Sequence, residues 1–382
     1  MRIRWTALAG LLVGLLAAAP AAAGGLFYRG HLHDGVAGVD GLAGGLAVAV
    51  SPDGAHVYVA GADDDAVAVF ARDAGNGGLE FLTVVRNDVS GVTGMRVPDA
   101  VAISPDGTHV YVTSREDDAL VVFTRDAGTG SLAYVETVRD GIGGVDGIDH
   151  ASGVAVSPDG AHVYATGEHD DAVATFARNG ATGTLTYLGV ARDGIAGVTG
   201  IHRPSAVTVS PDGASVYVAG GAIDSLGAFA RDATTGALTF LEAEAHSDDA
   251  PGVDRPNSIV VTADGRSVYV AGHDDDGVAA FARDPADGRL DFVEIERDHG
   301  FLGGLEGAFA VAASPDGAYV FAAGENDHTV STLRRDATTS ALTFVEAQRD
   351  GRLGVDGLRR ASALAVSPDG AHLYAIGHDD DA

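Results

Sequence analysis

The chain has 382 residues, a formal net charge of −30 at neutral pH, 54 glycines and no cysteine. The absence of cysteine and of lysine excludes disulfides, thiol nucleophiles, cysteine-based zinc sites, P-loops and Schiff-base lysines. The strong negative charge disfavours nucleic acid and anionic lipid as partners, and we expect neither nucleic-acid binding nor membrane insertion.

The first 23 residues have the features of an export signal. Arg2 and Arg4 give a positive start, residues 7–19 form a short apolar run, and residues 21–23 are alanines suited to cleavage before Gly24. The apolar run is too short for a membrane-spanning helix. We therefore expect an exported protein, secreted, periplasmic or on the cell surface, whose charge changes from −30 to −32 when the two arginines are removed.

The remainder, residues 24–382, consists of a unit that recurs every 52 or 53 residues. Its most regular element is a Ser-Pro-Asp-Gly turn or a close variant, in which proline, aspartate and glycine favour a tight antiparallel connection. We call the aspartates of these turns the anchors: Asp53, Asp106, Asp159, Asp212, Asp264, Asp316 and Asp369.

Each unit predicts four short strands. In the first unit these are residues 46–50, 56–60, 66–70 and 79–84, which are rich in valine and partly alternate between apolar and polar residues. A tyrosine usually follows the anchor by five residues and a phenylalanine by seventeen. Repeated four-stranded sheets bury both faces by stacking around an axis, with these aromatics between them. The sequence predicts one all-β domain, a seven-bladed β-propeller of four-stranded antiparallel blades.

The two ends of the chain predict how the ring closes. Leu26 and Tyr28 match Leu79 and Phe81 of the first unit's fourth strand, whereas residues 361–366 and 372–376 supply only the first two strands of a last blade. The N-terminal strand should therefore complete that blade and remove the exposed edges. Because the chain stops at Ala382, where a third strand should begin, either this blade lacks one strand or a short segment is missing. We favour the second interpretation.

The unit resembles a known group of propellers. Its core reads Ser-Pro-Asp-Gly-Ala-His-Val-Tyr-Val-Ala, then an acidic turn, Val-Phe-Ala-Arg-Asp and Thr-Gly-Ala-Leu-Thr-Phe. This pattern is similar to that of the seven-bladed lactonase-like propellers, which include 6-phosphogluconolactonase-type and muconate-lactonising proteins, and to Tyr-Val-Thr-Asn repeat propellers of microbial surfaces. The resemblance covers nearly all of residues 24–382 and implies the fold. It transfers no catalytic residue, because the pattern consists of turn and packing residues.

Acidic turns between the second and third strands should share one face of the disc with the connections between blades. Carboxylate oxygens suit Ca²⁺, although consecutive aspartates lack the alternating spacing of an EF-hand loop. The candidate ligands for Ca²⁺, the one cofactor that the sequence raises, are Asp63, Asp64, Asp65, Asp274, Asp275 and Asp276. The alternative is a solvated acidic rim with no cofactor.

Two residues before each innermost strand should line the mouth of the central channel, and here the copies diverge. We call these the mouth pairs: Ala43-Gly44, Arg96-Val97, Asp149-His150, His202-Arg203, Asp254-Arg255, Glu306-Gly307 and Arg359-Arg360. Arg96, Arg203, Arg255, Arg359 and Arg360 are the predicted anion-binding residues, since guanidinium groups bind carboxylate or phosphate in a bidentate manner. His150, His202 and Glu306 are the predicted proton-transfer groups.

Two functions fit these patterns. In the first, the protein is a non-enzymatic binding scaffold whose repeated acidic loops contact a protein partner. In the second, it is a hydrolase of a small anionic lactone at the channel mouth. We favour the first on sequence alone, because near-identical blades suit repeated contacts better than one asymmetric active site.

Overall fold

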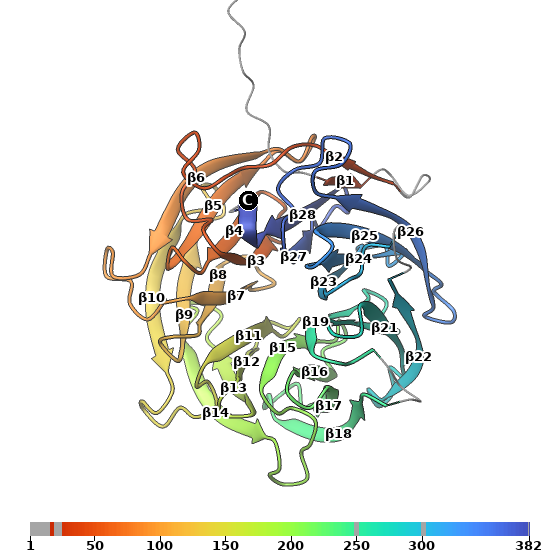
Figure 1. Cartoon of the computed structure of the whole chain (residues 1–382). Coiled ribbons are helices and arrows are strands. Elements are labelled where there is room, and N and C mark those ends of the chain that lie inside the picture. Colours follow the sequence, from red (N-terminus) through yellow and green to blue (C-terminus); the bar gives the residue numbers. More distant parts are fainter. Residues whose placement is uncertain (1–15, 19–24, 248–251, 299–302, 381) are drawn as a thin grey trace, which may run out of the picture.

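The computed structural model describes residues 16–18, 25–247, 252–298, 303–380 and 382 as an all-β propeller (Figure 1). The predicted four-stranded antiparallel blades are confirmed. Six blades each consist of four consecutive strands, from β3–β6 to β23–β26. One further four-stranded sheet, ordered β2-β1-β28-β27, combines strands from both ends of the chain.

The four strands of each repeat unit are numbered first to fourth, and strands with the same number have the same position in their sheets. The first strands surround the middle of the disc (Figure 1). The first strands are β3 (Gly45–Val50), β7 (Pro98–Ile103), β11 (Ala151–Val156), β15 (Pro204–Val209), β19 (Pro256–Val261), β23 (Ala308–Ala313) and β27 (Ala361–Val366). The second strands are β4 (His56–Gly61), β8 (His109–Ser114), β12 (His162–Gly167), β16 (Ser215–Gly220), β20 (Ser267–Gly272), β24 (Tyr319–Gly324) and β28 (His372–Gly377). The third strands are β5 (Ala66–Arg72), β9 (Ala119–Arg125), β13 (Ala172–Arg178), β17 (Ser225–Arg231), β21 (Gly277–Arg283) and β25 (Thr329–Arg335). The fourth strands are β6 (Leu79–Arg86), β10 (Leu132–Arg139), β14 (Leu185–Arg192), β18 (Leu238–Ala245), β22 (Leu290–Arg297) and β26 (Leu342–Arg349).

The sheet formed by both chain ends departs from this pattern at its third strand. β2 (Leu26–Tyr28) lies at its outer edge, in the place of a fourth strand, and β1 (Leu16–Ala18) lies between β2 and β28. β1 belongs to the segment predicted to be an export signal, and residues 1–15 and 19–23 of that segment lie outside the described residues. A three-residue 3₁₀ helix, His378–Asp380, follows β28. In the described part of the chain, no helix is long and apolar enough to cross a membrane.

The repeated aromatic residues form the core between blades, as the sequence predicts. Tyr58 packs with Val67 and Val69 of its own blade and with Phe123 of the next. The tyrosines that follow the anchors by five residues, and the phenylalanines that follow by seventeen, are almost completely buried. The burial of these large aromatic side chains between blades is the main contribution to the stability of a propeller.

A buried arginine at the end of the third strand connects each of six blades to its neighbour. Arg125, whose side chain is 0% exposed, donates from Nη2 to both carboxylate oxygens of Asp53 in the neighbouring blade, at 3.0 and 2.8 Å. Its Nε donates to the hydroxyl of Tyr58 at 2.8 Å. The equivalent pairs are Arg72–Asp369, Arg125–Asp53, Arg178–Asp106, Arg231–Asp159, Arg283–Asp212 and Arg335–Asp264. The anchor, predicted only as a turn residue, thus also holds adjacent blades together.

These contacts predict that the protein loses stability in two stages as the pH falls. Burial lowers the pKa of His56 and its counterparts below 6.5, so folding becomes less favourable as these histidines protonate in the unfolded chain. Burial raises the pKa of Asp53, but bonds from Ser51, the Ala55 amide and Arg125 together outweigh it and hold this pKa at about 2, against an ordinary 3.8. The stabilisation from Asp53 is therefore complete above pH 3.8 and is lost as the pH falls towards 2. We expect urea midpoints to decrease mildly below pH 6.5 and steeply between pH 4 and 2. A midpoint that stays constant from pH 7 to 3 would contradict this.

Candidate active site

The acidic turns position the mouth pairs through backbone hydrogen bonds. The second carboxylate of a turn accepts from the first residue of the mouth pair in its own blade, in the pairs Asp64–Ala43, Asp117–Arg96, Asp170–Asp149, Asp275–Asp254, Asp327–Glu306 and Asp380–Arg359. The third carboxylate accepts from the second residue in the next blade, in the pairs Asp65–Val97, Asp118–His150, Asp171–Arg203, Asp224–Arg255 and Asp276–Gly307. The mouth residues His150 and Arg203 have φ of 57° and 48°, a strained conformation that these bonds help to fix.

The six predicted Ca²⁺ ligands therefore have separate partners and do not converge as two triplets. Asp65 and Asp276 bond to backbone amides of neighbouring blades. Asp274 contacts His273 and Arg255, and Asp275 contacts His246 and Arg297. Asp64 alone of the six meets two other carboxylates, those of Asp34 and Asp40, among the described residues. Arg86 pairs with both Asp64 and Asp40 there.

A second ring of divergent residues, which the sequence analysis missed, lies directly after the second strands. Each follows its anchor by nine residues: Ala62, Arg115, Glu168, Gly221, His273, Glu325 and His378. The signal was available, because these positions differ in charge between copies that are otherwise nearly identical. Glu168 and Glu325 bind mouth residues, so the two rings form one polar surface.

Glu168 joins a histidine and an arginine from two adjacent blades. One of its oxygens lies 3.5 Å from Nε2 of His150, and the other accepts a hydrogen bond from Arg203. The His150 ring lies 4.3 Å from that of His169, which in turn contacts Asp149 at 3.3 Å. Burial, reinforced by the adjacent His169, lowers the pKa of His150 below its usual value. His150 is therefore neutral at pH 7 and able to accept a proton.

Glu325 makes the corresponding contacts with residues of blades further round the ring. Here the pKa of the contacting histidine is raised and not lowered. Nε2 of His273 lies 3.2 Å from Oε2 of Glu325, and Nε of Arg360 donates to Oε1 at 2.8 Å. The bond to Glu325 raises the pKa of His273, and the same bond lowers the pKa of Glu325 to about 2. The pKa values of these two histidines are thus shifted in opposite directions, the pattern expected of a base and an acid.

A pocket along the propeller axis is lined by the first strands and contains unsatisfied donors. The residues seven before each anchor line it: Leu46, Asp99, Ser152, Ser205, Asn257, Phe309 and Ser362. Arg115 donates to Asp99 at 2.6 Å. Nε of Arg115 and Nδ2 of Asn257 are buried and have no acceptor among the described residues. A buried donor without an acceptor is costly, and both of these side chains border the pocket.

The structure brings some of the predicted site residues into contact with one another and leaves others apart. The structure brings His150 and Arg203 together through Glu168, and Arg360 contacts Glu325. His202 contacts Asp171 at 2.9 Å on the same rim. Arg96 and Arg255 instead pair with Asp117 and Asp274 of their own blades, at 3.0 and 3.6 Å. Glu306 and Arg359 are exposed, and neither side chain has an ion pair within the described residues.

Comparison with solved structures shows the same fold in proteins of different function. A periplasmic gluconolactonase from Pseudomonas aeruginosa has a TM-score of 0.68 at 21% identity, covering 96% of this chain and 99% of its own. A protein from Bacteroides fragilis NCTC 9343 described as a 6-phosphogluconolactonase has a TM-score of 0.67 at 19% identity, covering 97% and 99%. Hydrazine synthase from Kuenenia stuttgartiensis has a TM-score of 0.65 at 18% identity, covering 92% and 97%. At these identities the likeness establishes the fold alone.

Sequence-family comparison is more specific. None of the curated proteins matches the chain. The family model described as "Lactonase, 7-bladed beta-propeller" matches residues 42–189, 150–300 and 245–352, three overlapping segments that together span most of the chain. The repeat pattern, the four-stranded blades and this match agree, and the chain belongs to the seven-bladed lactonase β-propeller family.

Proposed function

We propose that the protein hydrolyses a small anionic lactone at the mouth of the central channel. The observation that carries this proposal is the pair of glutamate-centred contacts, in which the pKa of His150 is lowered and the pKa of His273 is raised. Membership of the lactonase family supports the same reaction class. Sequence alone favoured a scaffold because of the repeated acidic turns, but most of those carboxylates bond to backbone amides that position the mouth pairs. The main argument for a scaffold is therefore weakened.

In the proposed reaction each group has a role. His150 accepts a proton from a water molecule, whose oxygen attacks the lactone carbonyl carbon. The resulting oxyanion is stabilised by an arginine, for which Arg115 is suited because its side chain is 36% exposed and lies among the residues that follow the second strands. The ring C–O bond then breaks, and His273 protonates the departing alkoxide. The products are a hydroxyl group and a carboxylate, and one proton is released to solvent at neutral pH.

We infer the substrate class from the arginines. Arg203 and Arg360 lie at the two glutamate-centred contacts, and the exposed Arg359 is adjacent to Arg360. Guanidinium groups at this end of an otherwise acidic protein favour a ligand with a carboxylate or phosphate. A sugar-acid lactone with such a substituent fits this charge.

The proposal extends to how the chain is assembled and where it acts. In the full chain the sheet β2-β1-β28-β27 is the seventh blade and closes the ring between β23–β26 and β3–β6. Once residues 1–23 are removed, β2, β28 and β27 remain of this blade. The first 23 residues direct export, so the enzyme acts in the periplasm, at the cell surface or outside the cell. The charged and histidine residues of the mouth pairs come from six of the seven sheets, so the site depends on this closure.

The test is proton release in a pH-stat, with a panel of sugar-acid lactones that carry a carboxylate or phosphate and matched neutral lactones. We expect saturable turnover, with the charged lactones preferred by at least about tenfold in kcat/KM, which corresponds to one additional ion pair. A correctly folded protein that hydrolyses none of them would exclude the proposal. Equal turnover of charged and neutral lactones would exclude the assigned role of the arginines.

The two histidines also predict the pH dependence. His150 must be neutral to accept a proton, and its pKa lies below 6.5, so the acid limb of kcat/KM should lie below 6.5. His273 must be protonated to donate, and its pKa is raised, so the alkaline limb should lie above 6.5. We expect a bell-shaped profile between pH 4 and 9. An acid limb at or above 6.5 would contradict the assignment of His150 as base.

A further inference from the structure

Two histidines and an aspartate from distant parts of the sequence converge beside the sheet β2-β1-β28-β27. His31 and His33 follow β2, and Asp356 lies in the connection between β26 and β27. Each of the three side chains offers one ligand atom, and these atoms lie within 4.8 Å of one another. The centroids of the two imidazole rings are 4.5 Å apart. Imidazole nitrogens together with a carboxylate are a ligand set for divalent transition metals.

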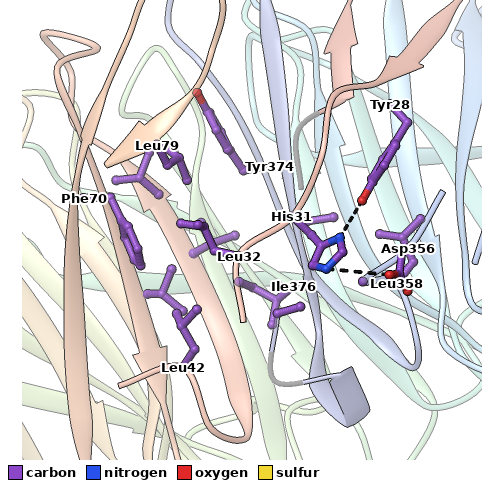
Figure 2. A pocket seen from close by; sticks show the side chains of 16 residues that line it. Tyr28, His31, Leu32, Leu42, Phe70, Leu79, Asp356, Leu358, Tyr374 and Ile376 are labelled. Atoms are coloured by element: carbon purple, nitrogen blue, oxygen red, sulfur yellow. Dashed lines mark hydrogen bonds and ion pairs between the residues drawn. The ribbon is translucent and has the colours of Figure 1, made fainter. Parts of the chain in front are cut away.

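The orientation of His31 suits a metal ligand. Its Nδ1 shares a hydrogen bond with the hydroxyl of Tyr28 at 2.7 Å, and its Nε2 lies 3.6 Å from Oδ2 of Asp356 (Figure 2). The second distance is too long for a hydrogen bond. It is close to the spacing of about 3.4 Å between two ligand atoms that share one tetrahedral Zn²⁺, given bonds of about 2.1 Å. An ion between these two atoms therefore requires little movement of either side chain.

The backbone fixes the tautomer of His33. Its Nδ1 contacts the carbonyl oxygen of Asp380 at 2.5 Å. Because a carbonyl oxygen can only accept, Nδ1 carries the proton and donates it, and the lone pair of the neutral ring lies on Nε2. Metal-binding histidines usually have this arrangement, in which the second ring nitrogen donates to a carbonyl or a carboxylate. His33 is therefore held in the tautomer that leaves Nε2 able to bind a metal.

Other blades place a cation at the equivalent position. In the blade β3–β6, Arg86 at the end of the fourth strand pairs with Asp40 of the preceding connection and with Asp64 of the acidic turn. In the blade β11–β14, Arg192 pairs in the same way with the two equivalent carboxylates. The fold thus brings two carboxylates together at this place and neutralises them with a guanidinium group.

The blade built from both chain ends has the two carboxylates but not the arginine. By the repeat, Asp356 corresponds to Asp40, Asp380 to Asp64, and His33 to Arg86. No arginine side chain forms an ion pair with Asp356 or Asp380 in the described part of the chain. His31 is a further departure, because the six other copies have valine, threonine, alanine or isoleucine at its position. Two imidazoles thus occupy the place at which other blades hold a cation.

We propose that His31, His33 and Asp356 form a binding site for a divalent transition metal ion such as Zn²⁺. The two imidazole nitrogens select this class over Ca²⁺ and Mg²⁺, which prefer oxygen ligands. The Asp356 side chain is 62% exposed, so an ion can enter from solvent, and water completes its coordination. The bound ion connects the segment after β2 to the connection before β27 and thereby stabilises the folded chain. The site shares no residue with the glutamate-centred contacts and is independent of the proposed hydrolysis.

The test is isothermal titration calorimetry of the full 382-residue chain, stripped of metal with a chelator, at about pH 7.5, where ordinary imidazoles are neutral. We expect one tight site for Zn²⁺ per chain, with Ca²⁺ bound at least about 100-fold more weakly. His33→Gln removes a ligand and should weaken Zn²⁺ binding by at least about 100-fold, whereas Tyr28→Phe removes only the partner of His31 and should weaken it by about tenfold.

The matched control is His246→Gln, which alters a histidine that contacts Asp275 outside this cluster. It should leave the affinity for Zn²⁺ within about twofold of the wild type. Excess Zn²⁺ should also raise the Tm of the wild type and of this control, but not that of His33→Gln.

Three outcomes would overturn the proposal: no saturable binding of Zn²⁺, equal affinity of the wild type for Zn²⁺ and Ca²⁺, or equal affinity of His33→Gln and His246→Gln for Zn²⁺. The comparison of the two ions uses the unaltered chain, so the test remains valid even if a variant folds poorly. Lactone turnover is not used as a readout, so a failure here and a failure of the proposed function remain distinguishable.

Discussion

His150→Gln is expected to lower kcat for lactone hydrolysis by roughly 10²–10⁴-fold, the usual contribution of a general base. Glutamine retains a polar group near Glu168 but cannot accept the proton from water. KM should change little, because the substrate anion is held by the arginines. The measurement is initial proton release in a pH-stat at saturating substrate, with the fold checked by thermal unfolding.

The matched control is His246→Gln. His246 is a partly exposed rim histidine that contacts Asp275 at 3.1 Å and has no part in either glutamate-centred contact. Its replacement should leave kcat within about twofold, as expected for a surface change away from the site. Equal losses in the two variants would indicate a general effect on the rim and not base catalysis by His150.

Asp53→Asn is expected to destabilise the fold by about 2–3 kcal/mol, because it leaves the buried guanidinium of Arg125 without its counter-charge. The estimate is at the lower end of the range for buried pairs, since the Asp53 side chain is 40% exposed. Urea unfolding at pH 7 measures this change. At low pH the free energy of unfolding of the variant should converge on that of the wild type, because Asp53 of the wild type is then protonated in both the folded and the unfolded state.

The chain offers its own control for this prediction in Asp316→Asn. Asp316 has the same turn geometry and the same bond from its serine, at 2.6 Å, but it has no arginine partner among the described residues. Its replacement should change the free energy of unfolding by no more than about 0.5 kcal/mol. If both variants are destabilised equally, the anchors stabilise the turn and not the interface between blades.

The strands and the core were predictable from sequence because they depend on local pattern. The anchor turns gave the unit length, and the predicted strands 46–50 and 66–70 extend in the structure only to Gly45 and Arg72 at their ends. Tyr58 and Phe70 could be assigned to the core because a stacked sheet requires a large side chain at a fixed place in each copy.

The partners of charged residues were not predictable, because they join positions far apart in the sequence. Asp53 and Arg125 are 72 residues apart, and Asp65 bonds to the amide of Val97 in the next blade. The sequence therefore led us to interpret the acidic turns as a rim for Ca²⁺ or a partner, and gave no sign that most of these turns also bond to the backbone of the mouth pairs. Regularity of a residue between copies indicated structure, and divergence indicated the candidate site.

Divergence between the copies pointed to the mouth pairs, but the equally divergent residues directly after the second strands were overlooked. The mouth pairs gave His150, Arg203 and Arg360, but the groups that connect them, Glu168 and Glu325, lie at the end of the second strands. A comparison of charge at every position of the seven copies would have found both. No sequence pattern gives the opposite pKa shifts of His150 and His273, since these depend on burial and on distances across blades.

The most direct test of the account compares the initial rate of proton release from a carboxylate-bearing sugar-acid lactone by the wild type and by the Arg203→Ala, Arg255→Ala, Arg360→Ala triple variant. We expect saturable turnover by the wild type and its loss in a triple variant that remains folded, since the substrate anion then has fewer cationic partners at the mouth. Turnover that the triple variant retains in full, or none by either protein, would contradict an active site at the channel mouth.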